Sequence, residues 1–264
     1  MTVRKKIIRR RVTAPGCDDA PHVEIAYDPT RPKPVTFVYP YYENPQMLAF
    51  QVDVWNAYPI DLRRHLEIVV VDDGSPGVSA EEVLRAADLR VRIALYRIEV
   101  DVRWNWLAAR NLAVSQADRP DDWHLLTDMD HVVMPAVLDR VIHGDHDPAI
   151  TYRFRREERD GTPVQPHPNS WLLTARRFWQ IGGYDEALSG HYGTDGEFRR
   201  RAAKTAPIRI LTDRLVRYEF FRDASTTRYK RKQPEDAAVQ RLIAARGPDW
   251  KPKVLSFPWT RIPL

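Results

Sequence analysis

Two acids interrupt a hydrophobic run near the middle of the chain. The stretch 124–135 reads HLLTDMDHVVMP, and apolar residues lie on both sides of Asp128 and Asp130. A buried carboxylate without a partner is unfavourable enough that it shifts its pKa or binds a cation. If the run is a strand, the two acids project to the same side. Two converging carboxylates, completed by substrate phosphates, form a site for Mg²⁺ or Mn²⁺.

A structural role is the alternative for these acids. Asp is a favoured N-cap residue, so Asp128 and Asp130 would also suit the start of a helix near Pro135. A second pair, Asp72 and Asp73, follows the apolar run LEIVVV and precedes a Gly-Ser-Pro-Gly turn. A turn-forming role is equally open for this second pair. All four carboxylates lie where a strand is expected to end.

Strand and helix patterns alternate along the chain from Val35 onward. Continuous apolar runs such as VTFVY and LEIVVV are typical of strands buried on both faces, and PQMLAFQVDVWNAY and NWLAARNLAVSQA predict amphipathic helices. A hairpin is expected at Asp160–Gly161, and a short helix is expected between a Thr174 cap and Gly182. This alternation predicts a mostly parallel α/β sheet, in which ligands bind beyond the carboxyl ends of the strands.

The composition is that of an ordinary globular protein. The 264 residues, 43% hydrophobic and 29% charged, suffice for one large domain or two small ones. The basic start leads into no apolar run of signal-peptide length, and no segment approaches the ~18 apolar residues of a membrane span. The single cysteine, Cys17, excludes an intrachain disulfide and agrees with a reducing compartment. We therefore expect a cytoplasmic protein.

Positive charge is concentrated in three clusters. The net charge is +5, and basic residues gather at 4–11, 199–204 and 228–232. Such clusters favour a polyanionic partner, for example nucleic acid, a membrane surface or a phosphorylated substrate. The alternative is that each cluster is simply a solvated face or a loose terminus.

Six stretches occur in an order that resembles a known family. VTFVYPYYEN, LEIVVVDDGSPG, AARNLAVSQA, LLTDMD, IGGYDE and YGTDGEFRRR together cover about residues 35–204. Each is weak alone, but their order and spacing resemble the family 2 glycosyltransferases, whose nucleotide-sugar-binding fold is called GT-A. The resemblance implies a Rossmann-like, mostly parallel sheet flanked by helices, with a small antiparallel portion on the acceptor side. It divides the chain into a basic N-terminal extension (1–33), a GT-A domain (34–222) and a basic C-terminal helix and tail (223–264).

The resemblance also implies roles for individual residues. Asp130 matches the principal metal ligand, and Asp128 matches a ligand of the metal or the ribose. Asp195 matches the general base of inverting members, which deprotonates the acceptor hydroxyl for in-line attack. The residues that match the nucleotide site are Pro40, Tyr42, Asp72, Asp73, Arg110 and Asp128.

The chain departs from the family pattern on the acceptor side. Thr194 stands where the family has an acid before the base, which leaves Glu197 as a fallback base. No histidine follows His191, so the late histidine that many relatives supply to the metal has no counterpart here. The side chains expected around the sugar and acceptor are Trp104, His167, Asn169, Trp171, His191 and Glu197. For each tryptophan, a place in the core is the alternative.

The resemblance therefore implies a metal-dependent, inverting glycosyltransferase. Its donor is a nucleoside diphosphate sugar, with a uridine diphosphate sugar favoured, and its acceptor is the hydroxyl of a glycan or a lipid-linked sugar. The basic clusters add the hydroxyl of a hydroxymethylated DNA base as a further acceptor. Nucleotidyl transfer is disfavoured because YPYYENPQ contains neither a Gly-rich phosphate loop nor a basic residue. A nucleic-acid-binding or non-catalytic module on the same scaffold is the alternative from another class, and the basic clusters motivate it.

Overall fold

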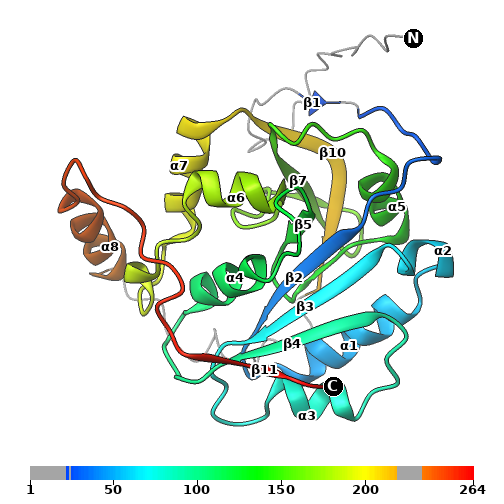
Figure 1. Cartoon of the computed structure of the whole chain (residues 1–264), viewed down its shortest axis with the longest axis horizontal. Helices are drawn as coiled ribbons and strands as arrows, with labels where there is room; N and C mark the ends of the chain where they lie inside the picture. The colour runs from blue at the N-terminus through cyan, green and yellow to red at the C-terminus, as the bar shows by residue number, and fades with distance from the viewer. Residues whose placement is uncertain (1–21, 24, 219–233) are drawn as a thin grey trace.

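Four parallel strands form the centre of the sheet. In spatial order they are β4 (Arg92–Ile98), β3 (Leu66–Asp72), β2 (Val35–Tyr41) and β5 (Trp123–Leu126). The computed structural model describes residues 22–23, 25–218 and 234–264 (Figure 1). Because all four strands run the same way, their carboxyl ends lie at one edge of the sheet. The structure confirms the predicted mostly parallel α/β sheet.

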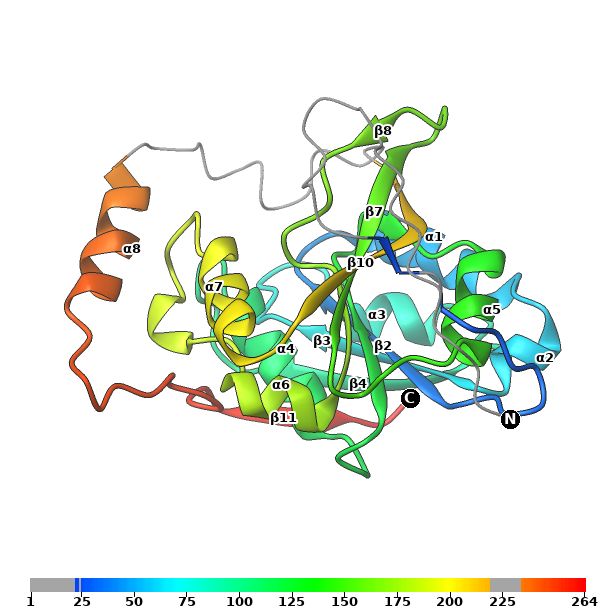
Figure 2. The same cartoon turned by 90° about the horizontal axis from the view of Figure 1, so that it is seen from above.

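Further strands extend this sheet on both sides. Beyond β5 come β9 (Trp171–Thr174) and β7 (Thr151–Glu158), each antiparallel to its predecessor, and then β10 (Ile208–Arg217) and β1 (His22–Val23), which continue parallel to β7. β6 (His131–Val132) pairs with β10, and β8 (Pro163–Val164) pairs with β7 in the predicted hairpin. On the other edge, β11 (Trp259–Ile262) runs antiparallel to β4. Figure 2 shows the β7–β8 hairpin standing out from the body of the sheet.

Helices cover both faces of the sheet. One face carries α1 (Pro45–Asn56), α2 (Ile60–Arg63), α3 (Ala80–Arg85) and α5 (Pro135–His143). The other carries α4 (Trp106–Ser115), α6 (Ala175–Ile181), the short 3-10 helix η1 (Glu186–Leu188), α7 (Asp195–Thr205) and α8 (Pro234–Ala244).

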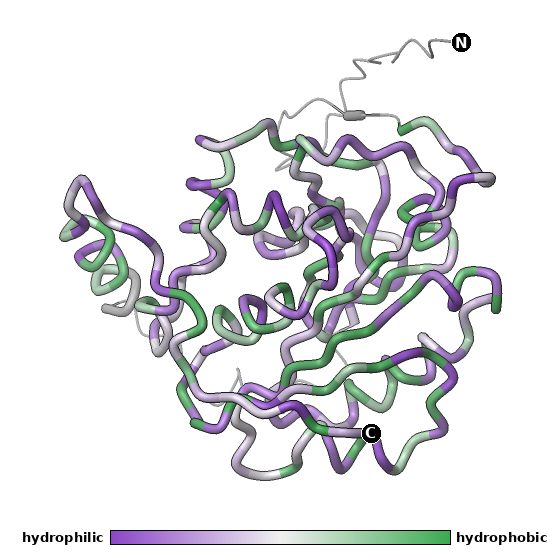
Figure 3. Tube along the Cα trace, viewed as in Figure 1, coloured by the Kyte–Doolittle hydropathy of each residue, from purple (hydrophilic) through white to green (hydrophobic). Residues whose placement is uncertain are grey.

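Alternation along β2 explains this double cover. Phe37 and Tyr39 point into the cluster with α1, whereas Val38 points into the cluster with α4. Figure 3 shows the central strands as hydrophobic along most of their length. A strand that must bury both faces therefore reads as a continuous apolar run.

Local signals define several helix ends. Ser79 and Glu82 form a reciprocal capping box at the start of α3, and the Thr174 side chain accepts from Arg177 N to begin α6. Gly182 ends α6 with a φ of 95°, a conformation that glycine adopts without strain. The predicted limits of α6 are confirmed.

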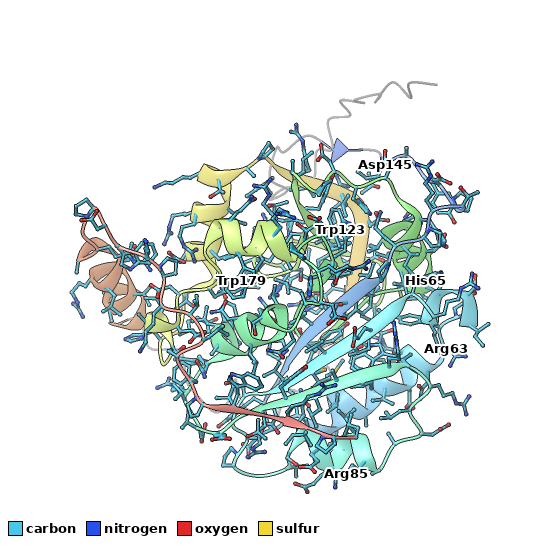
Figure 4. The ribbon with its side chains drawn as sticks, in the orientation of Figure 1. Arg63, His65, Arg85, Trp123, Asp145 and Trp179 are labelled. Carbon is cyan, nitrogen blue, oxygen red and sulfur yellow. The ribbon has the colours of Figure 1, made fainter. Side chains whose placement is uncertain are left out.

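Parts of the predicted N-terminal extension and of the C-terminal tail pack against the central domain. Asp28 N donates to His143 O, and Lys33 N donates to Ile142 O, at the end of α5. At the other terminus, β11 adds to the sheet, and Arg85, labelled in Figure 4, donates to Pro263 O at 3.1 Å. The predicted boundary at 222–223 and the basic clusters 4–11 and 228–232 lie outside the described residues. Within the described part of the chain, no helix combines the length and the apolar character needed to cross a bilayer.

Gly74, in the turn after β3, allows a test of this fold. Gly74 and Gly161 both have positive φ, 74° and 83°, but a Cβ on Gly74 would fall on the Val100 carbonyl oxygen, whereas nothing lies within 4 Å of one on Gly161. We expect Gly161→Ala to cost about 1 kcal/mol through backbone strain alone. Gly74→Ala should cost a further ~1–3 kcal/mol because the turn must move. Denaturant unfolding of both variants checks this difference, and equal losses would contradict it.

Candidate active site

A fully buried arginine lies behind the two central acids. Arg110, on α4, donates from Nη2 to Asp128 Oδ1 at 2.5 Å and from Nη1 to the Tyr184 hydroxyl at 3.3 Å. Its guanidinium carbon lies 4.8 Å from the centre of the Trp106 ring. A guanidinium without access to water is stable only beside an anion. Arg110 therefore fixes the position of Asp128.

Asp128 has a second side-chain neighbour. His167 Nε2, from the segment between β8 and β9, lies 3.0 Å from Asp128 Oδ2. Burial alone would raise the pKa of Asp128, but His167 and Arg110 outweigh burial and hold that pKa well below its ordinary value. Both carboxylate oxygens of Asp128 are thus engaged by side chains of this protein.

The two acids follow β5 rather than forming part of it. The strand stops at Leu126, and residues 128–131 form a turn in which His131 N donates to Asp128 O at 3.1 Å. The prediction that strand alternation aligns Asp128 with Asp130 is therefore wrong. The contacts to Arg110 and His167 place Asp128 instead, although the charge of Asp128 still acts on the pKa of Asp130.

Asp130 is the more open of the two acids. About 44% of its side chain is exposed, and its backbone carbonyl accepts from Tyr218 N. The Nδ1 atom of buried His131 lies 2.7 Å from Asp130 Oδ1, yet no described residue gives that oxygen a well-aligned hydrogen bond. Burial would raise the pKa of Asp130, but His131 more than offsets burial and lowers it. Asp130 is thus an ionised and partly exposed carboxylate that could bind a cation.

These side chains suit a cation that protein and substrate bind together. Among the described residues, no group of three or more His, Cys, Asp or Glu side chains forms a metal site by itself. Mg²⁺ is usually held by one or two carboxylates, with substrate phosphates and water completing its shell, and Mn²⁺ prefers the same oxygen ligands. Asp130, whose side chain is about 44% exposed, fits this arrangement. Asp128 has less free capacity, because Arg110 and His167 already engage it.

The aspartates after β3 have different environments. Asp72 accepts from Ser75 N at 2.8 Å and Ala80 N at 2.9 Å, and Arg97 Nη1 lies 3.2 Å away. Asp72 is therefore committed to shaping the turn. Buried Asp73 keeps one oxygen, Oδ1, without a hydrogen-bond partner among the described residues. Burial raises the pKa of Asp73 well above its ordinary value, and the Asp72 charge adds to the rise.

Two predicted nucleotide residues lie at the end of the neighbouring strand. Pro40 is within β2, opposite Val71, and Tyr42 comes just after the strand. The Tyr42 hydroxyl donates to Asp101 Oδ1 at 2.9 Å, and the charge of Asp101 also acts on the pKa of Asp73. Tyr42, Asp73 and Asp101 thus come from three separate loops to one place at the carboxyl edge.

Asp195 lies at the first position of α7. Asn169 Nδ2 donates to Asp195 Oδ1 at 2.5 Å, and Asn169 itself is buried. His167, two residues earlier, contacts Asp128. One short segment therefore bridges Asp128 and Asp195, because residues two apart are separated by no more than about 7 Å. The predicted base and the predicted donor-side acid share this bridge.

Glu197 has a different environment from Asp195. It is buried, and it pairs with Arg201 at 2.7 Å and with Arg246 at 2.6 Å. Two guanidinium partners stabilise its ionised form, and the pKa of Glu197 is lowered even though burial opposes this. The expectation of Glu197 as a fallback base or pocket residue is therefore wrong. Arg201 belongs to the predicted basic cluster 199–204, whose Arg199, Arg200 and Lys204 are exposed.

The remaining predicted pocket residues fall into two groups. Trp171 is fully buried on β9 and packs against Phe198 at a ring distance of 5.5 Å, so it belongs to the core and not to a pocket. Trp104 has a positive φ of 50° and packs against Tyr192 at 5.2 Å. His191 Nδ1 lies 3.2 Å from Ser189 O in the same loop as Tyr192. Trp104 thus lies beside the loop with His191, which precedes α7.

Three residues near the site carried no sequence signal. Tyr184 bonds Arg110 and stacks on Phe198 at 4.3 Å, although its motif suggested only a turn. Arg156 Nη1 approaches His131 Nε2 at 3.4 Å, and Arg246 pairs with Glu197. An arginine in an arginine-rich sequence does not reveal its partner, so spacing alone gives no means of selecting these two.

Comparisons with known proteins bear on the family and the fold of this chain. A family model described as Glycosyl transferase family 2 matches residues 36–223. The mannosyltransferase PcManGT from Pyrobaculum calidifontis, in complex with GDP-Man and Mn²⁺, is similar at a TM-score of 0.54 and 20% identity over 73% of this chain and 59% of that chain. TarS 1-349 of S. aureus, in complex with UDP-GlcNAc, is similar at a TM-score of 0.60 and 17% identity over 80% of this chain and 65% of that chain.

These structural matches establish the fold, and the family model establishes membership. The chain spans 59% and 65% of the lengths of PcManGT and TarS 1-349, and no curated protein matches it. The family model covers most of the 264 residues, including both acids after β5 and Asp195. The chain belongs to glycosyl transferase family 2 and has the GT-A fold.

Proposed function

We propose that this protein transfers a sugar from a nucleoside diphosphate sugar to an acceptor hydroxyl, with a divalent cation and with inversion at the anomeric carbon. One observation carries this proposal: the segment 167–169 connects Asp128 on the donor side to Asp195 at the start of α7. A leaving group held near Asp128 and Asp130 would then lie across from a carboxylate able to accept a proton. Displacement with inversion needs this opposed placement.

On the donor side, each of the acids after a strand would have a different role. The free Oδ1 of Asp73 and the nearby Tyr42 offer polar contacts to the base and ribose, with Pro40 shaping the same edge. Asp72 acts through the turn that it holds. Asp130 would be the principal metal ligand, and Asp128, oriented by Arg110, would contact the ribose or the metal. A bound Mn²⁺ or Mg²⁺ would offset the negative charge that develops on the leaving diphosphate.

Asp195 has the arrangement that a general base requires. Asn169 donates to Oδ1 of Asp195 and thereby orients the carboxylate. The other oxygen then takes the proton of the acceptor hydroxyl while the hydroxyl oxygen bonds to the anomeric carbon. The bond from that carbon to the diphosphate breaks with its electron pair, so the products are a glycoside, a nucleoside diphosphate and protonated Asp195. No covalent sugar–enzyme intermediate is needed.

The donor base and the acceptor are less sharply defined. The ligands bound in the similar structures, GDP-Man and UDP-GlcNAc, support a nucleoside diphosphate sugar, and we propose a uridine diphosphate sugar first. A glycan or lipid-linked sugar is the proposed acceptor, and a hydroxymethylated DNA base is the alternative that the basic clusters favour. We propose a cytoplasmic location. A purely binding role is not favoured, because Asp130 and Asp195 retain open carboxylate oxygens.

Asp130 provides the test of the metal site. We expect Asp130→Asn to weaken Mn²⁺-dependent binding of UDP or GDP at least about tenfold, because even outer-shell partners of a metal contribute 10–100-fold in affinity. Asp88→Asn is the matched control, since among the described residues the Asp88 carboxylate pairs with exposed Arg90 at the surface. Isothermal titration with and without Mn²⁺ measures both. Equal affinity in wild type and Asp130→Asn would refute the assignment.

Asp195 provides the test of the chemical step. We expect Asp195→Asn to lower kcat for transfer, or for hydrolysis of the donor by water, by about 10²–10⁴-fold, the usual contribution of a general base. Affinity for UDP or GDP with Mn²⁺ should stay within about twofold, because Asp195 acts on the acceptor side. Steady-state kinetics and titration on the same preparation check both statements. A parallel loss of nucleotide affinity would argue against the role of a base.

A further inference from the structure

The chain between α8 and β11 runs across buried acids that adjoin the active site. We name residues 246–256 the C-terminal strap. Arg246, its first residue, donates from Nη2 to Asp185 Oδ2 at 2.5 Å and from Nη1 to Glu197 Oε1 at 2.6 Å. Both acids are almost wholly buried. One guanidinium therefore joins the turn after α6 to the first turn of α7.

The rest of the strap binds the turn after α6 through its backbone. The Glu186 carboxylate accepts from Leu255 N at 2.7 Å, and from Ser256 N at 2.7 Å and Ser256 Oγ at 2.6 Å. Lys253 N donates to Asp185 Oδ1 at 2.9 Å, and Lys253 O accepts from Glu186 N at 2.8 Å. These bonds satisfy carboxylates that would otherwise be buried without partners.

Two of these acids, Glu186 and Glu197, adjoin residues of the candidate active site. The fourth donor to Glu186 is Asn111 Nδ2 at 2.7 Å, and Asn111 follows Arg110 on α4. The side-chain amide of Asn111 donates to Tyr184 O and accepts from Tyr184 N, and the Tyr184 hydroxyl accepts from Arg110. On the other side, Glu197 lies two residues after Asp195 in the first turn of α7.

We propose that the C-terminal strap is a working part of the active site and that Arg246 is a positioning residue for Asp195. The strap lies beyond residue 223, where the match to the family model ends. This inference rests on the function proposed above. Without Arg246, the buried carboxylates of Asp185 and Glu197 lose their shared cation, and Arg201 remains beside Glu197, where it also donates to Ile181 O and Gly183 O. The first turn of α7 then loses one of its links to the turn after α6, so it can shift, and Asp195 shifts with it.

Arg246→Gln tests the proposal, with Arg241→Gln as the control. Arg241 is exposed on α8, and its described contacts involve only its backbone. We expect Arg246→Gln to lower kcat for hydrolysis of UDP-GlcNAc or GDP-Man by up to about 10²-fold, the typical effect of a misplacement near 1 Å. Affinity for UDP or GDP with Mn²⁺ should stay within about twofold. Arg246→Lys should recover part of kcat, because an ammonium restores the charge but not the fork of two parallel donors.

A double variant separates positioning from general stability. If Arg246 acts through Asp195, adding Arg246→Gln to Asp195→Asn lowers kcat no further. Unchanged kcat in Arg246→Gln, an equal loss of nucleotide affinity, or a fully additive double variant would each overturn the proposal.

Hydrogen exchange keeps the test independent of activity. Amides at the start of α7, residues 195–198, should exchange faster in Arg246→Gln than in wild type, while those of β2 and β3 should not change. If wild type neither binds UDP or GDP with Mn²⁺ nor turns over a nucleotide sugar, the proposed function fails, and exchange alone decides on the strap. Unchanged exchange at 195–198 would overturn the positioning role even in an active enzyme.

Discussion

The buried ion pair between Arg110 and Asp128 is the interaction on which the site depends. A guanidinium with no exposed surface requires an anion, and Asp128 is the anion that lies against it at 2.5 Å. The pair links α4 to the turn after β5, so it sets the position of the turn that carries Asp130. Removing Asp128 would leave the buried guanidinium of Arg110 uncompensated, which is among the costliest changes in a protein interior. The site is therefore as rigid as the packing of α4 on the sheet.

The parallel sheet explains why these groups meet. β2, β3 and β5 run in one direction, so their carboxyl ends deliver Tyr42, Asp73 and Asp128 to the same edge. Antiparallel β9 then returns the chain past β5, which brings the segment with His167 and Asn169 alongside. Polar groups gather at this edge because strands buried on both faces leave them no other solvated position. The meeting of these groups at one edge is thus a consequence of strand direction.

Three buried acids connect α4 and α7 to the C-terminal strap. Asp185, Glu186 and Glu197 are all almost fully buried, and their partners come from α4, α7 and the C-terminal strap. Such networks stabilise a structure only when every member is satisfied, and they then restrict it to one arrangement. This requirement couples α7, with Asp195 at its start, to elements far away in the sequence. It also explains why a glutamate two residues after the candidate base has no free carboxylate.

The sequence by itself determined the fold class, most elements and the residue types of the site. Apolar runs marked β2 and β3, and Thr174 and Gly182 marked the limits of α6, because these signals act within a few residues. The order of six motifs was enough to indicate the family.

Only the tertiary structure decided which residues are free to act. Asp72 and Glu197 are committed to backbone or arginine partners, Trp171 is core, and Asp128 is held by His167 rather than by strand alternation. The physical reason is that these roles depend on partners far apart in the sequence, such as Arg246 and Asp185, which are 61 residues apart. A carboxylate, a guanidinium or an indole looks the same in sequence whether it is open or satisfied. What surrounds it is known only once the chain has folded.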